Sequence, residues 1–118
     1  MNMKARAPLD MELVGELKEI MAEGFVTLVE SYQRDSAERL AAMQGALEAE
    51  DRAQLRQLAH SLKGSSSNLG AVEVAELCIA LESHMAEAPA AELQGLLDAL
   101  NEAYATAIEA LRALCQDT

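Results

Sequence analysis

Apolar residues recur at every third or fourth position along most of this chain, the spacing that places them on one face of an α-helix. The pattern predicts a short helix ending near Gly24, long helices over 25–49 and from Asp51 to Gly70, a fourth carrying the stripe 74–85, and a last one beginning at Pro89. Four long amphipathic helices with short connections indicate an all-α fold, an antiparallel up-down-up-down four-helix bundle with an additional short N-terminal helix. We expect residues 1–8 to form a flexible N-terminus and residues 9–118 a single helical bundle domain.

Polar residues and glycine mark where several of these helices begin and end. Asp10 is a suitable N-cap for the first helix, and Leu9 and Val14 stand at the positions of a hydrophobic staple around it. Asp51 begins a D-x-x-Q pattern that is typical of a second capped start. Gly70 is a suitable residue to stop the third helix.

The composition limits what such a domain can do. With 118 residues, 51% hydrophobic and 3% aromatic, the chain can fill one modest core, but it has no room for a nucleotide-binding fold plus a substrate domain. No apolar run approaches the ~20 residues of a membrane span, and the start lacks the apolar stretch of a signal peptide. Cys78 and Cys115 fall in apolar helical registers, so we expect reduced core thiols of a cytoplasmic protein, although a disulfide between them stays open.

The net charge of −11 argues against a nucleic-acid partner, for which a basic surface is expected. The charges are unevenly distributed: no Lys or Arg occurs between Gly64 and Ala110, whereas the third helix carries Arg52, Arg56 and Lys63. Such a basic patch would steer an acidic partner to the third helix. A solvated surface with scattered charges is an equally good explanation.

The third helix groups its polar side chains on one side. At 100° per residue, four leucines lie about 140–180° away from His60, namely Leu55, Leu58, Leu62 and Leu69. These leucines would bury the helix against the core while His60 faces solvent. The polar residues and glycine within about 60° of the imidazole are Arg56, Gln57, Lys63, Gly64 and Ser67.

Gly64 stands beside His60 inside a helix, where glycine is less favourable than alanine by roughly 0.5–1 kcal/mol. Its advantage is that it leaves room for the surface of another molecule to approach the ring. The alternative is a helix that frays here into a serine-rich loop. Against this, Leu69 continues the apolar stripe and Gly70 is the better stop.

An exposed imidazole is mostly uncharged at neutral pH and has a nucleophilic ring nitrogen. No Ser-His-Asp or Cys-His catalytic arrangement can be recognised in the sequence. Two histidines without clustered carboxylates also make a poor metal site. The chemistry that remains is acceptance of a group from a partner. A phosphoryl group is the obvious candidate, because a neighbouring Lys can hold its oxygens.

The residues from 60 to 71 read His60-x-Leu62-Lys63-Gly64-Ser65-Ser66-x-x-Leu69-Gly70-Ala71. This motif closely resembles the signature of histidine-containing phosphotransfer (HPt) domains of multistep two-component relays, and the likeness in helix pattern and length extends over nearly the whole chain. In that family the His is phosphorylated reversibly by exchange with an aspartate of a receiver domain. The resemblance implies that His60 is the phospho-acceptor, that Lys63 stabilises the phosphoryl group and that Gly64 gives the receiver access.

Glu82 should come level with His60, because a helical hairpin that reverses at Gly70 pairs positions roughly symmetric about the turn. We expect Glu82 or a neighbour to accept a hydrogen bond from the imidazole Nδ1–H, which would fix the tautomer and leave Nε2 as the nucleophile. The HPt family often has Gln near this position, so Glu is a departure from the family. The alternative is a solvated Glu82 without a role. His84 lies on a different face and is assigned none.

The resemblance implies a stand-alone relay protein between the receiver domains of a hybrid sensor kinase and a response regulator. It would be stoichiometric rather than an enzyme, without an ATP site, cofactor or metal of its own, since Mg²⁺ belongs to the receiver. We expect Arg56, Gln57 and Ser67 to contact the receivers. We expect the protein to be a cytoplasmic monomer without nucleic-acid or membrane partners.

Three alternative functions remain. The first is a helical adaptor without phosphotransfer. The second is a carboxylate-bridged metal bundle, for which the paired Glu-x-x-His motifs are missing, and the third is a kinase dimerisation domain, which would need a further ATP-binding domain.

Overall fold

The computed structural model describes residues 7–116, and every regular element in this range is an α-helix. The helices are α1 (Met11–Met21), α2 (Gly24–Glu48), α3 (Arg52–Leu69), α4 (Val72–His84) and α5 (Ala90–Gln116). The all-α prediction is confirmed, and each helix begins and ends within a few residues of its predicted position. Of the N-terminus predicted to be flexible, residues 1–6 lie outside the described range.

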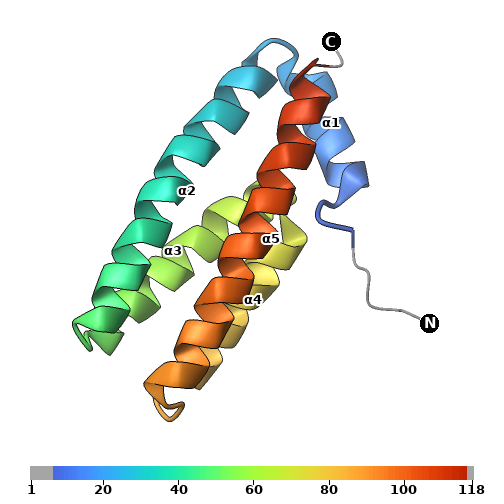
Figure 1. Cartoon of the computed structure of the whole chain (residues 1–118). Helices are drawn as coiled ribbons and strands as arrows, with labels where there is room; N and C mark the ends of the chain where they lie inside the picture. Colours follow the sequence, from blue (N-terminus) through green and yellow to red (C-terminus); the bar gives the residue numbers. More distant parts are fainter. Residues whose placement is uncertain (1–6, 117–118) are drawn as a thin grey trace.

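Helices α2 to α5 form a four-helix bundle in which each helix runs antiparallel to the next (Figure 1). α3 packs against α2 and α4, and α5 closes the ring by packing against α4 and α2. α1 lies at the end of the bundle where α2 begins and α5 ends, and it contacts α2 and α3. This is the up-down-up-down bundle with an additional N-terminal helix that the apolar pattern predicts.

Two aspartates cap the helices that they precede. Oδ1 of Asp10 accepts a hydrogen bond from the backbone N–H of Leu13 at 3.2 Å, at the start of α1. Oδ1 of Asp51 accepts one from the N–H of Gln54 at 3.1 Å, at the start of α3. Both caps satisfy N–H groups that have no partner inside the helix, as the sequence predicts.

Gly70 ends α3 and joins α1 to the bundle. Its φ of 84° lies in the left-handed region that favours glycine. Its carbonyl accepts a hydrogen bond from the backbone N–H of Asp10 at 2.8 Å. A Cβ at this position would lie 2.8 Å from Cγ2 of Val14. Glycine is therefore required here both by the backbone conformation and by the close approach of α1.

The core is built mostly from aliphatic side chains of the predicted stripes. Its largest fully buried members are Phe25, Met43, Leu55, Leu62, Leu81, Leu93, Leu97, Leu100, Leu111, Val14, Val29 and Val74. α1 leaves one large apolar side chain outside this core, because Ile20 is 80% exposed. α1 is seated through Leu9 and Val14, which are buried, and Ile20 lies about 120° around the helix from Val14.

Two tyrosines connect α2 to its neighbours. Oη of Tyr32 and Oγ of Ser66 lie 2.7 Å apart in the interior between α2 and α3. Tyr104 of α5 donates a hydrogen bond to the backbone oxygen of Gln33 in α2 at 2.8 Å. Burial raises the pKa of Tyr32, and burial with the nearby Tyr32 raises the pKa of Tyr104 to about 12. Because α3 carries His60, the contact between Tyr32 and Ser66 also helps to fix the position of that residue.

Neither cysteine forms a disulfide. Cys78 is buried in α4, whereas Cys115 near the end of α5 is half-buried. The bridge that the sequence left open is therefore not formed. The prediction of a core thiol is confirmed for Cys78, and Cys115 packs against the core as a partly buried residue.

Candidate functional site

α3 presents His60 to solvent because its apolar side chains lie on the opposite side of the helix. The buried residues of α3 are Leu55, Ala59, Leu62, Ser66 and Leu69, and Leu58 is half-buried at the edge of this face. The side chain of His60 is 66% exposed. The ring can therefore be reached from outside the bundle.

α4 brings Glu82 to the imidazole. Nδ1 of His60 lies 3.0 Å from Oε2 of Glu82, and the Glu82 side chain is only 24% exposed. An ionised carboxylate accepts hydrogen bonds and donates none, so the contact assigns the ring proton to Nδ1. The lone pair of the neutral ring then lies on Nε2. The contact is the one that the symmetry of the hairpin about Gly70 predicts, while its effect on phosphotransfer stays a prediction.

Lys63 follows His60 by one turn of α3 and is half-buried. Its charge and that of Glu82 both act on the buried thiol of Cys78 in α4. Burial, with a contribution from Glu82 and against the effect of Lys63, raises the pKa of Cys78 to about 12. The ammonium group of Lys63 and the carboxylate of Glu82 thus lie near the same part of α4. Because its pKa is raised, the Cys78 thiol is unsuited to act as a nucleophile at neutral pH.

Gly64 has open space around it. A Cβ at this position would meet no atom within 4 Å outside its own stretch of helix. Since α3 continues to Leu69, the alternative in which the helix frays at Gly64 is wrong. The packing of the bundle does not require glycine here, in contrast to Gly70, and a role of Gly64 in partner access stays a prediction.

The residues expected to contact a partner, Arg56, Gln57 and Ser67, are all exposed on α3.

Arg52 makes a contact inside the bundle that sequence reasoning missed. Its Nη1 donates a hydrogen bond to the backbone oxygen of Met85 at 2.6 Å, and this ties the start of α3 to the end of α4. Arg52 is therefore engaged within the bundle, and the basic charges of α3 left near the ring are those of Arg56 and Lys63.

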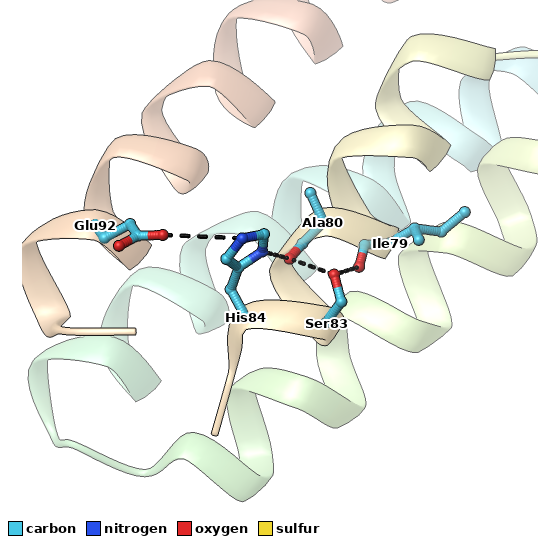
Figure 2. A network of polar contacts seen from close by, with 5 residues as sticks. All are labelled: Ile79, Ala80, Ser83, His84 and Glu92. Atoms are coloured by element: carbon cyan, nitrogen blue, oxygen red, sulfur yellow. Dashed lines mark hydrogen bonds and ion pairs between the residues drawn. The ribbon is translucent and has the colours of Figure 1, made fainter. Parts of the chain in front are cut away.

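The second histidine, His84, stands at the end of α4 in a network of polar contacts (Figure 2). Its Nδ1 lies 2.8 Å from the backbone oxygen of Ala80, and its Nε2 lies 3.9 Å from Oε2 of Glu92 in α5. Ser83 beside it donates to the backbone oxygens of Ile79 and Ala80. His84 thus connects the end of α4 to the start of α5. In the sequence, only its position just before the connection between these helices indicates such a contact.

Within residues 7–116, no three His, Cys, Asp or Glu side chains are arranged to hold a metal ion. The alternative of a carboxylate-bridged metal bundle therefore lacks a ligand set in that range. None of the helices in the described part of the chain is long and apolar enough to cross a bilayer.

The model of the Hpt domain family matches residues 27–116. The chain therefore belongs to the Hpt domain family, the class of proteins that carry out histidine phosphotransfer in two-component phosphorelays with receiver domains as partners. Among solved structures, it is similar to histidine-containing phosphotransfer protein B (HptB) from Pseudomonas aeruginosa PAO1, with 31% sequence identity and a TM-score of 0.88 over 97% of this chain and 99% of that chain. No curated protein matches the chain.

Proposed function

We propose that this protein is a stand-alone phosphorelay carrier. It takes a phosphoryl group from the receiver-domain aspartate of a hybrid sensor kinase onto His60 and passes it to the receiver-domain aspartate of a response regulator. The observation that supports this most strongly is the exposed imidazole with Nδ1 held by Glu82 and Nε2 left available. The similarity to HptB over nearly the whole of both chains supports the same conclusion.

The transfer itself needs few groups from the carrier. The lone pair on Nε2 of His60 attacks the phosphorus of the aspartyl phosphate, the P–O bond breaks, and its electron pair returns to the receiver carboxylate. Lys63 supplies a positive charge for the phosphoryl oxygens. Gly64 leaves the approach to the ring open. Because the receiver holds the Mg²⁺, the carrier needs no metal of its own.

The receiver would dock on the outer side of α3, where Arg56, Gln57 and Ser67 are exposed around the ring. The positive charge of Arg56 favours the acidic surroundings of a receiver aspartate over a basic surface. The carrier acts stoichiometrically rather than as an enzyme, as a monomer in the cytoplasm.

A phosphotransfer profile tests this function. Phosphorylated receiver domains of the same cell are incubated with the wild-type protein, with His60→Gln, and with His84→Gln as a matched control that removes the other histidine. We expect the wild type and His84→Gln to gain an acid-labile, base-stable phosphoryl group and His60→Gln to gain none. A wild-type protein that binds receivers but never gains such a group would be a helical adaptor, and the proposal would be wrong.

A further inference from the structure

Glu82 places a negative charge on one side of the imidazole and leaves the other side open. Its Oε2 is in hydrogen-bond contact with Nδ1 of His60, and most of its side chain is shielded from solvent whereas most of the ring is not. A partly shielded carboxylate keeps more of its influence on a neighbouring charge than one in bulk water, because solvent screens it less. Glu82 is therefore placed to act on the charge state of the ring.

Other charged groups lie on the helices that surround this region. α3 itself contributes Arg56 and Lys63. In the antiparallel register set by the contact between Tyr32 and Ser66, Glu38 and Arg39 of α2 stand level with His60. α1 meets α3 at Gly70, about 15 Å along the helix from His60. These groups carry both signs, and Glu82 is the one whose carboxylate contacts the ring.

Phosphorylation changes the charge of this ring. If Nδ1 keeps its proton while Nε2 forms the bond to phosphorus, the product is a phosphoimidazolium with one positive charge. When the group leaves again, the P–Nε2 bond breaks, its electron pair returns to Nε2, and a neutral imidazole remains. If Nδ1 had first lost its proton, an imidazolate would have to leave, which is a much poorer leaving group. The proton on Nδ1 therefore decides whether the phosphohistidine can be discharged.

We propose that Glu82 is the counter-ion of phosphorylated His60 and keeps the phosphohistidine protonated, and hence transferable, to higher pH than an uncharged neighbour would. The proposal rests on the proposed function, since it concerns the same histidine. A nearby carboxylate favours the charged form of its partner. The amide of a Gln could accept from Nδ1–H or donate to the bare nitrogen, so it would keep the contact without favouring the protonated ring. Glu82 is thus a positioning residue that acts through His60.

His84 provides a comparison within the same molecule. Its Nδ1 also meets an oxygen, that of Ala80, but its Nε2 faces the carboxylate of Glu92 (Figure 2). A carboxylate at that position repels phosphoryl oxygens and stands on the side from which they would approach. At His60 the carboxylate lies at the other nitrogen, where it stabilises the positive ring. Since the two side chains are 66% and 50% exposed, the position of the carboxylate distinguishes them better than exposure does.

The test uses potassium phosphoramidate, a small phosphoryl donor that loads the full chain without a receiver. The hydrolysis rate of the phosphorylated protein is then followed from pH 6 to pH 10 for the wild type, Glu82→Gln and Glu82→Asp. Glu87→Gln is the matched control, because it removes one carboxylate from the exposed turn after α4. Hydrolysis requires the protonated ring, so its rate falls as Nδ1 loses its proton, and the midpoint of this fall reports the influence of residue 82.

We expect the midpoint to lie about one pH unit lower in Glu82→Gln than in the wild type, as loss of one contacting charge predicts. On the alkaline side, phosphorylated Glu82→Gln should then persist up to about tenfold longer. The midpoint for Glu82→Asp, which keeps the charge, should lie between those of Glu82→Gln and the wild type. The midpoint for Glu87→Gln should equal that of the wild type. Coincident profiles for Glu82→Gln and the wild type would overturn this inference and leave the proposed function standing. If phosphoramidate loads no acid-labile group on the wild type, or loads His60→Gln equally well, the proposed function fails and the inference fails with it.

Discussion

Replacing Gly64 by Gln should make the protein more stable and less active at the same time. A side chain at this position meets no atom within 4 Å of its Cβ outside its own helix, so it should fit without displacing the core. Glycine inside a helix is less favourable than alanine by about 0.8–1.0 kcal/mol, and Gln is among the better helix formers. We therefore expect the free energy of unfolding to rise by roughly 0.5 kcal/mol.

The same side chain would project about 40° around α3 from His60, on the side from which we propose that a receiver reaches Nε2. A misplacement of about 1 Å at the reacting atoms can cost on the order of 100-fold in rate. We expect the initial rate of phosphotransfer from a phosphorylated receiver to fall by roughly 10- to 100-fold. Urea unfolding measures the first effect, and a time course of transfer measures the second.

Gly64→Ala is the matched control, because it gains the helix propensity without the long side chain. It should be stabilised at least as much as Gly64→Gln and lose much less of the transfer rate. If Gly64→Gln transferred phosphoryl groups at the wild-type rate, the idea that glycine provides access would be refuted. If it were less stable than the wild type, the space around residue 64 would not be open.

Gly70→Ala should lower the free energy of unfolding by about 2–3 kcal/mol, since the left-handed backbone costs alanine about 1–2 kcal/mol and its Cβ would stand 2.8 Å from Cγ2 of Val14. Wild-type stability in urea would contradict this. The free energy of unfolding should also fall above pH 10, because Tyr104, with its pKa raised to about 12, keeps its proton in the fold while the unfolded chain releases it. This contribution is complete below pH 10 and is lost as the pH rises through about 12, so the stability difference between the wild type and Tyr104→Phe should narrow over that range. If the free energies of unfolding of the wild type and Tyr104→Phe fell in parallel with pH, Tyr104 would not be responsible for the loss of stability.

The parts of the fold that could be predicted from the sequence depend on residues close together in the chain. Asp10 and Asp51 cap their helices through N–H groups three residues away. Gly70 stops α3 through its own backbone conformation. The contact between Glu82 and His60 spans more of the chain, but a single turn separates the two helices, and the symmetry of a hairpin is enough to bring these residues level.

The features that could not be predicted depend on how one helix is seated on another. Ile20 is exposed because α1 is held at the end of the bundle through other residues. The spacing of apolar residues within α1 does not show which of them will contact the bundle. Arg52 reaches the backbone of Met85, 33 residues away, and a backbone oxygen leaves no mark in the pattern of side chains. The contact of His84 with Glu92 likewise joins two different helices, α4 and α5, and depends on how they are placed relative to each other.

The claim that His60 carries the phosphoryl group on Nε2 is tested most directly by phosphorus–nitrogen NMR on the full chain with nitrogen-15-labelled histidine, after incubation with a phosphorylated receiver domain. One phosphorus signal coupled to Nε2 of His60 is predicted, because Glu82 holds Nδ1. A phosphorus signal coupled to Nδ1 of His60 or to His84, or no phosphohistidine at all, would contradict it.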